Sequence, residues 1–449
     1  MKTFVYDEFN PQDMAMMQAL YSRSAASVEE HAEKVKKSGS GNFMERYYVG
    51  YGHASIADCG STTIFIEGVS MLVAKAIQDW PLYSGQETSS RYIDMSKQAI
   101  IDPLAIARGG AGAKNSPARK ILDKWMKFYT ESQAEVEVHL RKKYPRKPDE
   151  DEQVYNRAIK ARIFDILRGF LPAGVTTQLS WHTNLRQAHD KLVLLRYHPL
   201  TEVREVAEQI HGQLKQKYPQ SFGHQQFPLQ EKYRQFSAEN FTYFSDKKYA
   251  GDFIARTNIK NAELDSYLKV TKSRPTKTSL PTFLADLGNV TFEFLLDFGS
   301  FRDIQRHRNG TCRMPLLTTK FGFNNWYLEQ LPSTLAKKAR VLIKEQMAAI
   351  KKIASAPKTS KAPKSSKEIT QYYVAMGFNV PCKVTYGLPA AIYTMELRSG
   401  RLVHSTLRAV AHKMHKAIHK MFPKLMLHAD LSLDDWDIRR GTQDIREKK

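Results

Sequence analysis

The 449-residue sequence is short of cysteine, of acidic side chains and of long apolar runs. Its three cysteines, Cys59, Cys312 and Cys382, form no CxxC pair, which excludes a disulfide framework and a four-cysteine metal site. We therefore expect no metal ligands. No run approaches the roughly 18 apolar residues of a membrane span, and the opening MKTFVYDEFN has acids where a secretory signal has an apolar core. These absences predict a cytoplasmic protein.

The shortage of acids leaves a large positive charge. Lysine and arginine number 68 against 46 aspartates and glutamates, so the formal net charge is +22. Such a charge calls for an anionic partner, which can be nucleic acid, a membrane surface or a phosphorylated small molecule. The hydrophobic fraction of 42% is that of a globular protein. Part of the charge has a simpler explanation in solubility, because four lysines lie in one Lys/Ser/Pro tract at 354–368.

Helical and strand-like patterns alternate between breaks rich in small and polar residues. Leu122, Trp125 and Tyr129 recur at helical spacing, whereas TTIFI and VTFEFL are short and β-rich. The sequence therefore predicts helices at 118–144 and 335–353, strands at 62–66 and 290–295, and linkers at 108–117, 145–152 and 354–368.

The decisive feature of the organisation is an internal repeat. REVAEQIHGQLKQKYP, from Arg204 to Pro219, has the same apolar pattern, length and aromatic-proline end as RAVAHKMHKAIHKMFP, from Arg408 to Pro423. A strand-to-helix pattern also recurs, at Thr62 and at Asn289. The two spacings, 204 and 227, make the second copy about 23 residues shorter between these points. We therefore expect two divergent copies of one α/β unit, at 1–228 and 229–449.

Two clusters carry chemistry suited to an anionic ligand. GHAS, with His53, precedes the first strand, and LYSGQETSSRY, from Leu82, follows the next helix with hydroxyls, amides and one guanidinium. These groups suit a phosphate and a polar base, although such a segment is also typical of a solvated turn. QRHR, from Gln305 to Arg308, could clamp a pyrophosphate or stack on a flat ring, or it could be a solvated basic face.

With these motifs in order, the sequence resembles a tandem of flavin-dependent thymidylate synthases. The resemblance covers most of the first copy and is weaker in the second. In the first copy, the family's GH-x-S segment corresponds to Gly52, His53 and Ser55, and its S-x-N-E-x-S-x-R-Y segment corresponds to Ser84, Gln86, Glu87, Ser89, Arg91 and Tyr92. The LLP-type segment corresponds to Arg168–Pro172, and the N-x-R segment to Asn184 and Arg186. The LR and EIR segments end at Arg196 and Arg204. The second copy keeps the family's RHR as Arg306, His307 and Arg308, and also Arg398, His404 and Arg408.

The departures from the family pattern are complementary. The first copy has Asp79, Trp80 and Pro81 in place of RHR, and the second has Leu280 in place of His53. Further replacements in the second copy are Thr311 for Ser84, Arg313 for Gln86, Thr318 for Arg91, and Tyr386 and Leu388 for Asn184 and Arg186. The family's glutamine three residues before RHR is Ala76 in one copy and Asp303 in the other. We therefore expect one composite site to which both copies contribute.

The resemblance implies an α/β (α+β) fold, two fused copies of a sheet flanked by long helices. It implies reductive methylation of dUMP to dTMP with methylenetetrahydrofolate, FAD and NADPH, without attack by a cysteine. It also implies a homodimer of the fused chain that imitates the family's tetramer. The implied roles are catalytic for Arg196; FAD-binding for His53, Ser55, Glu87, Asn184, Arg186, Arg306, His307 and Arg308; and substrate-binding for Ser84, Gly85, Gln86, Ser89, Arg91, Arg168 and Arg196.

Two alternatives stay open. The same chemistry could act on another pyrimidine nucleotide or on an RNA base, which the missing glutamines and the surplus charge permit. The chain could also be a non-catalytic nucleotide- or nucleic-acid-binding paralogue. Nucleic acid is possible but not favoured as a partner, because the sequence has no RNP, zinc or helix-turn-helix signature.

Overall fold

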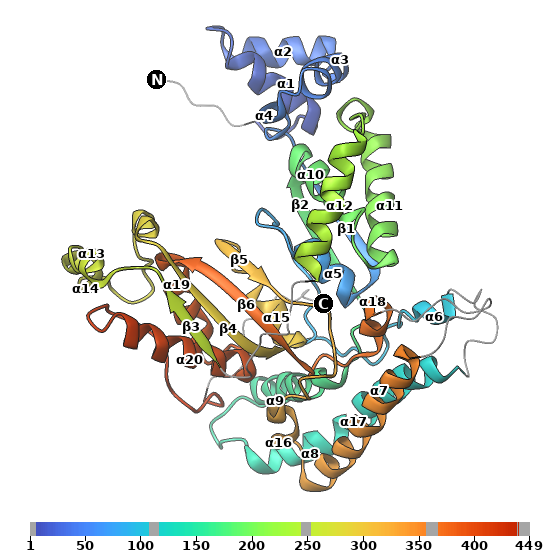
Figure 1. Cartoon of the computed structure of the whole chain (residues 1–449), viewed down its shortest axis with the longest axis vertical. Coiled ribbons are helices and arrows are strands. Elements are labelled where there is room, and N and C mark those ends of the chain that lie inside the picture. Colours follow the sequence, from blue (N-terminus) through green and yellow to red (C-terminus); the bar gives the residue numbers. More distant parts are fainter. Residues whose placement is uncertain (1–5, 107–115, 244–252, 356–366, 438, 440–449) are drawn as a thin grey trace. The chain divides into compact units, whose positions relative to one another are not determined.

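The computed structural model describes residues 6–106, 116–243, 253–355, 367–437 and 439 (Figure 1). Most of two expected linkers, 108–117 and 354–368, therefore lies outside the described residues. Within the part of the chain that the structure describes, no helix is both long enough and apolar enough to cross a membrane.

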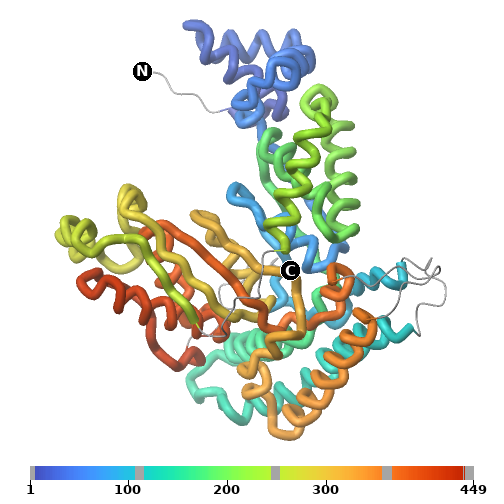
Figure 2. Tube along the Cα trace, viewed as in Figure 1, coloured from blue at the N-terminus to red at the C-terminus, as the bar shows by residue number. Residues whose placement is uncertain are grey.

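The chain forms two compact units, each assembled from two separate stretches of sequence. The first unit contains Met1–Glu87 and Thr177–Thr242, and the second contains Thr88–Thr176 and Tyr243–Lys449 (Figure 2). These units divide the chain differently from the copies expected at 1–228 and 229–449. The duplication concerns the origin of the sequence, and it stays a prediction.

The first unit is mostly helical around a two-stranded sheet of β1 and β2. Ser70 ends β1 and caps α5 by accepting a hydrogen bond from the Val73 amide. Its elements are α1 (Pro11–Tyr21), α2 (Val28–Ser38), α3 (Gly41–Phe43), η1 (Met44–Gly50), α4 (Ala54–Ala57), β1 (Ser61–Ser70), α5 (Met71–Gln78), β2 (Thr176–Asn184), α10 (Leu185–Leu195), α11 (Thr201–Lys217), η4 (Pro219–Ser221) and α12 (Pro228–Thr242).

The second unit is built on an antiparallel sheet in the order β3-β4-β6-β5. Its elements before β4 are α6 (Pro103–Ile106), α7 (Pro117–Glu131), α8 (Gln133–Lys143), α9 (Glu152–Leu167), η3 (Arg168–Phe170), β3 (Ile254–Thr257), α13 (Asn261–Asp265), α14 (Leu268–Lys272) and η5 (Thr282–Leu287). The rest are β4 (Asn289–Asp297), α15 (Phe298–Ile304), β5 (Gly310–Arg313), α16 (Asn325–Glu329), α17 (Ser333–Ala354), α18 (Lys367–Thr370), η6 (Gln371–Tyr373), β6 (Asn379–Gly387), α19 (Leu388–Ser399) and α20 (Ser405–Met421).

These elements confirm the predicted mixed α/β fold and most of its boundaries. The strands at 62–66 and 290–295 lie within β1 and β4, and the helix at 335–353 lies within α17. The helix expected at 118–144 is divided at Ser132 into α7 and α8. Trp125 of α7 is fully buried, and its indole Nε1 donates to the Tyr373 carbonyl at 3.0 Å, so the apolar face of α7 packs in the core as its spacing indicates.

A symmetric pairing inside the second unit relates two segments that lie 203 positions apart. The amides of Ala173 and Gly174 donate to the carbonyls of Val374 and Tyr372, at 2.9 and 3.0 Å. In return, the amides of Met376 and Gly377 donate to the carbonyls of Leu171 and Gly169, at 2.8 and 2.7 Å. Each bond of the first pair maps onto one of the second by the same shift of 203. This is the pairing that two copies of one ancestral segment would make about a local two-fold axis.

Strand register tests the alignment of the two copies in more detail. Ser84 pairs with His182 on β2, and Thr311 pairs with Thr385 on β6. Thr311 therefore occupies the Ser84 position, as expected from the sequence. The same register assigns Gly387 to the Asn184 position, and both residues are helix N-caps. The expected equivalences of Tyr386 and Leu388 were wrong by one residue, and Gly387 and Pro389 take those positions.

Candidate ligand site in the second unit

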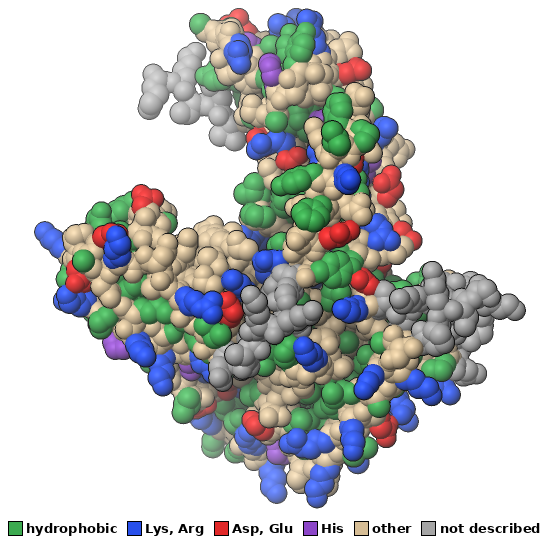
Figure 3. All heavy atoms as spheres, in the orientation of Figure 1, with side chains coloured by type: hydrophobic (Ala, Val, Ile, Leu, Met, Phe, Trp, Pro, Cys, Tyr) green, Lys and Arg blue, Asp and Glu red, His purple; other side chains and the backbone are tan. Residues whose placement is uncertain are grey.

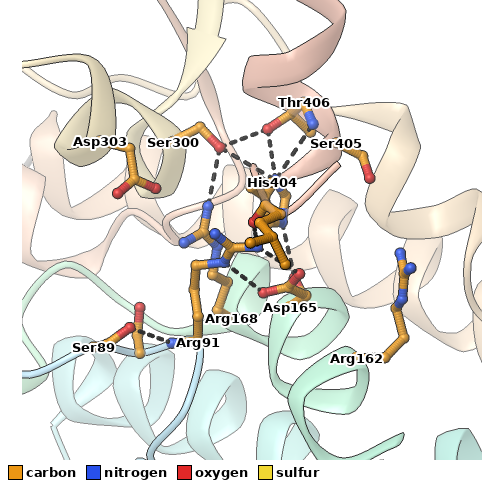
Figure 4. Close-up of polar contacts among 12 residues, drawn as sticks. Ser89, Arg91, Arg162, Asp165, Arg168, Ser300, Asp303, His404, Ser405 and Thr406 are labelled. Atoms are coloured by element: carbon orange, nitrogen blue, oxygen red, sulfur yellow. Dashed lines mark hydrogen bonds and ion pairs between the residues drawn. The ribbon is translucent and has the colours of Figure 1, made fainter. Parts of the chain in front are cut away.

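A buried ion pair anchors one side of a polar cluster in the second unit (Figure 4). Arg91 follows the Ser89 turn, and Asp165 lies in the last turn of α9. The Arg91 Nε and Nη2 atoms donate to the two Asp165 carboxylate oxygens at 2.8 and 3.1 Å. Only 12% of the Arg91 side chain and 4% of the Asp165 side chain are exposed. A two-point guanidinium–carboxylate pair in such surroundings fixes the orientation of both side chains.

A hydrogen-bonded network joins Arg168 to the start of α20. The Arg168 Nη2 donates to the Ser300 hydroxyl at 3.0 Å, and that hydroxyl lies 2.6 Å from the Thr406 hydroxyl. His404 closes the network, because its Nδ1 lies 2.9 Å from the Thr406 hydroxyl and its Nε2 lies 3.2 Å from the Asp165 carbonyl. Burial and the Arg168 charge keep the pKa of His404 well below its usual range. His404 is therefore a neutral link between the two arginine anchors.

The Asp303 carboxylate lies among several guanidinium groups. Burial alone would raise the pKa of Asp303, but the charges of Arg168, Arg306 and Arg91, with a smaller contribution from Arg398, lower it to about 2. The Arg306 Nη2 lies 4.0 Å from one Asp303 oxygen. Asp303 is therefore a permanent internal counter-ion of the cluster.

The RHR segment is held mainly through its histidine. The Arg398 Nε donates to the His307 Nε2 at 2.7 Å, and the Arg398 Nη2 donates to the Asp303 carbonyl at 2.8 Å. Burial and the neighbouring Arg398 lower the pKa of His307 to about 3, so the imidazole is neutral and can accept this bond. The Arg306 side chain is 44% exposed, so it can meet a ligand from solvent.

The cluster as a whole is cationic. It combines six arginines with three aspartates, an excess of three positive charges: Arg91, Arg168, Arg302, Arg306, Arg308 and Arg398 against Asp165, Asp297 and Asp303. Several buried polar atoms also lack a hydrogen-bond partner among the described residues. They include both amide atoms of Gln305, the Arg168 Nε and one Asp297 oxygen. Positive charge with unused donors and acceptors is the chemistry of a site for an anionic, polar ligand.

The structure brings together six of the predicted site residues. They are Ser89, Arg91 and Arg168 from the first half of the sequence, which Figure 4 labels, and Arg306, His307 and Arg308 from the second. The Ser89 hydroxyl accepts a hydrogen bond from the Arg91 amide at 3.3 Å. Sequence reasoning missed Asp165, whose signal is an acid inside the apolar stretch RIFDIL of α9. It also missed Ser300, which no motif marks.

Four other predicted residues, 84–87, lie along the edge of β2 in the first unit. A Cβ at Gly85 would lie 2.0 Å from the Ser180 carbonyl oxygen, so only glycine permits this close pairing. The Gln86 carbonyl accepts from the Ser180 amide at 2.8 Å, and Glu87 accepts from the Gln78 amide group at 2.5 Å. These contacts give residues 84–87 a structural role, and their ligand contacts stay a prediction.

The remaining predicted residues also belong to the first unit. Asn184 caps α10 through the Gln187 amide at 2.8 Å, and the Arg186 Nε donates to Asp58 at 2.7 Å. Arg196 forms an ion pair with Glu231 of α12 at 3.4 Å. His53 lies beside the Tyr51 ring, and Ser55 lies in α4. Their binding roles, and the catalytic role of Arg196, stay predictions.

The fold is mixed α/β, and its second unit carries a buried, arginine-rich polar cluster with a net positive charge. Residues 6–220 match the model of the family described as thymidylate synthase complementing protein. The match covers 215 of the 449 residues, so the first part of the chain is similar to that family, in agreement with the resemblance seen in its motifs.

Two relatives match almost the whole chain. A UPF0159 protein of Chlamydia muridarum is 26% identical over 463 residues, which cover 91% of this chain and 84% of that protein. A UPF0159 protein of Thermoplasma acidophilum is 23% identical over 501 residues, which cover 97% and 98% of the two chains. Neither name states an activity.

Proposed function

We propose that this protein is a flavin-dependent thymidylate synthase-like enzyme, and that the cationic cluster of the second unit belongs to its active site. The proposed reaction is the reductive methylation of dUMP to dTMP with methylenetetrahydrofolate, FAD and NADPH. The observation that carries it is that Arg91, Arg168 and Arg306 all act on the Asp303 carboxylate, while Arg398 joins His307 to the same cluster. The family match over residues 6–220 supports the same reading.

The donor set of the cluster fits a flavin dinucleotide. Arg306, His307 and Arg308 would hold it, because two guanidinium groups match the charge and geometry of a pyrophosphate. Tyr393 is 49% exposed, and its ring centroid lies 5.9 Å from that of His307, so a flat aromatic surface lies beside the cations. When bound, FAD supplies the redox chemistry of the reaction.

The chain's own residues bind and orient the nucleotide in this proposal. Arg91 and Arg168 would hold its phosphate and sugar, and Asp165 and Ser300 keep the two guanidinium groups in place. The roles predicted for residues of the first unit belong to the same proposal. Among them, Arg196 would favour the N3-deprotonated uracil, whose C5 is more nucleophilic. A cation beside a developing anion stabilises it by a few kcal/mol, about 3 in a water-excluded site.

Rescue of a thymidine-requiring bacterial strain tests the proposal. We expect the wild-type gene to permit growth without thymidine, and the purified protein to be yellow and to oxidise NADPH faster with dUMP. The matched control is the Arg91→Ala variant, which should bind flavin but fail to rescue. A colourless protein that takes up no added FAD would contradict the proposal.

A second candidate is the same chemistry on a different pyrimidine, and Asp303 favours it. Its carboxylate neutralises one guanidinium at the place where a nucleotide phosphate would bring its own negative charge. A ligand that carries less charge, such as a pyrimidine within RNA, would meet less repulsion. Failure of rescue with flavin bound would favour this candidate. Asp303→Gln should then raise the affinity for dUMP about tenfold, since it removes one nearby charge.

A further inference from the structure

A second cationic pocket lies in the first unit, and no residue of the second unit's cluster lines it. Its volume is about 290 Å³, and it is lined by α10, α11, α12 and the 222–227 connection. His189 comes from α10, His211 and Lys215 from α11, His224 from the connection and Arg234 from α12. Arg196, at the end of α10, also borders it.

The charges that face the pocket are unbalanced. Arg196, Lys215 and Arg234 carry three positive charges, and the acid on the lining is Glu231. Both Arg196 and Arg234 pair with that carboxylate, which also accepts the Tyr197 hydroxyl. One acid therefore serves two guanidinium groups and leaves Lys215 unbalanced on the lining. A pocket of this composition attracts a multiply charged anion.

The three histidines provide neutral donors. The His189 and His224 ring centroids lie 4.0 Å apart, with the planes inclined by 31°. Burial, followed by the nearby His224 and Arg234, lowers the pKa of His189 to about 3. Burial lowers the pKa of His211 and His224 as well, and around His211 Glu208 opposes Arg196 and Lys215. At neutral pH these imidazoles are therefore uncharged and can be protonated when an anion arrives.

One of these imidazoles has an unused polar atom. The His224 Nδ1 is buried and has no hydrogen-bond partner among the described residues. A metal ion is a poor occupant, because three cationic side chains face the same space. Moreover, no three His, Cys, Asp or Glu side chains in the described part of the chain are placed to hold one. The unused nitrogen is better satisfied by an anion's oxygen, donating to it once protonated.

We propose that this pocket binds the phosphate group of a small organic phosphate, held by Arg234, Lys215 and the three imidazoles. A phosphate dianion presents several acceptor oxygens, which this set of ammonium, guanidinium and imidazole donors matches. The volume fits a phosphate with a small organic part and lies at the low end for ligand pockets. Arg196, which has a role in the proposed function, borders the pocket, whereas Arg234, Lys215 and the three imidazoles have no role in that proposal.

Titration of the full-length protein with sulfate and with pyrophosphate tests the pocket, followed by the histidine proton resonances in NMR spectra. We expect both anions to shift the His189 and His224 resonances. Arg234→Gln should weaken binding about tenfold, and the matched control Lys232→Gln, two positions away on an exposed part of α12, should leave it unchanged.

Glu231→Gln gives the opposite effect, which misfolding cannot imitate. Removing the internal counter-ion should tighten sulfate binding severalfold. Affinity for sulfate should also rise as the pH falls from 7.5 to 5.5, because a bound dianion favours the protonated imidazoles while sulfate keeps its charge. A pH-independent affinity would contradict the histidine part of the proposal.

Three results would overturn the proposal. They are no binding of either anion at millimolar concentration, equal affinities for Arg234→Gln and Lys232→Gln, and no gain from Glu231→Gln. Binding of a single-stranded oligonucleotide without binding of sulfate or pyrophosphate would replace the small phosphate by a nucleic-acid backbone.

Discussion

The strand-to-helix corner β1–α5 and its counterpart β4–α15 have the same backbone arrangement and the same kind of helix cap, but different residues follow the two helices. Each strand ends in a capping residue, Ser70 or Asp297, 227 positions apart, whose side chain accepts the amide three residues on. After α5, residues 79 and 80 are hydrogen-bonded to α10. The Trp80 Nε1 donates to Gln187 at 3.1 Å, and the Lys191 Nζ donates to the Asp79 carbonyl at 2.8 Å. After α15 the equivalent positions carry the RHR arginines.

If the predicted duplication is right, this difference shows how two copies of one unit can come to carry different residues at the same corner. At the first corner, the Trp80 indole and the buried Lys191 make hydrogen bonds within the unit, and burial lowers the pKa of Lys191 to about 8. The second corner keeps exposed guanidinium and relies on Asp303 to balance it. In the proposed function the second corner supplies the donor set for the flavin's pyrophosphate and the first corner does not, so we expect one flavin site per chain.

The strongest way to break this comparison is to remove the arginines of the second corner. Arg306→Ala combined with Arg308→Ala should lower FAD affinity about 100-fold or more, since each charge-assisted contact contributes roughly 1.5–3 kcal/mol. Fluorescence titration of FAD measures the loss. Arg340→Ala, on an exposed part of α17, is the control and should bind FAD like wild type. Retained flavin in the double variant would show that the second corner does not hold it.

The next largest effect is expected on stability, when Asp165, the acid that pairs with Arg91, loses its charge. Asp165→Asn leaves Arg91 buried without its counter-charge, and we expect a loss of about 3 kcal/mol in the free energy of unfolding. Guanidinium chloride unfolding measures it. Asp123→Asn breaks the more exposed Arg119–Asp123 pair and should cost about 0.5 kcal/mol or less. Equal losses of stability in both variants would contradict the claim that Arg91 needs a buried counter-charge.

A smaller effect is expected in the pH dependence of stability. The pKa of His307 in the folded protein is about 3, below the unfolded value of 6.5, so its stabilising effect is present above pH 6.5 and is lost as the pH falls towards 3. His307→Gln should therefore reduce the loss of stability between pH 7 and pH 4 by roughly 2 kcal/mol. Thermal unfolding across this range measures it.

The control for His307 is a histidine outside the cluster. His419→Gln, on an exposed part of α20, should leave the loss of stability between pH 7 and pH 4 unchanged. If His307→Gln lost more stability than wild type between pH 7 and pH 4, this would contradict the claim that His307 is buried and neutral.

The smallest effect should come from the β1–α5 corner, where Trp80 is hydrogen-bonded to Gln187. Trp80→Phe removes the hydrogen bond to Gln187, so we expect a loss of about 1 kcal/mol in stability and unchanged flavin binding. Chemical unfolding and FAD titration of the same sample measure the two quantities. Loss of flavin with intact folding would give the first corner a ligand role and remove the contrast.

Local patterns were sufficient to predict much of the fold. Apolar spacing placed α17, and β-rich runs placed β1 and β4, because these signals depend on residues near in sequence. The division into two discontinuous units was not predictable, since it depends on pairings such as Pro172 with Ala375 across 203 positions.

The candidate site was predictable where a motif carried it. Arg91, Arg168 and the RHR arginines came from the family resemblance, and the structure brings them into one cluster. Asp165 and Ser300 were missed because their importance lies in what they touch. One register error, at Tyr386 and Leu388, arose where no turn or charge fixes the alignment.

The surplus positive charge has two origins in the structure. Some arginines gather in the cluster, whereas lysines of α17 such as Lys337, Lys344 and Lys351 are exposed. Blue lysine and arginine side chains are scattered over the visible face of the second unit (Figure 3). The scattered charges favour solubility, and the gathered ones belong to the proposed ligand site.

The number of FAD molecules bound per chain tests the central claim most directly. Absorbance of the purified, FAD-saturated protein at a known protein concentration gives this ratio. The contrast between the two corners predicts one FAD per chain. A ratio of two would show that the β1–α5 corner also binds flavin, and a ratio of zero would contradict the flavin site itself.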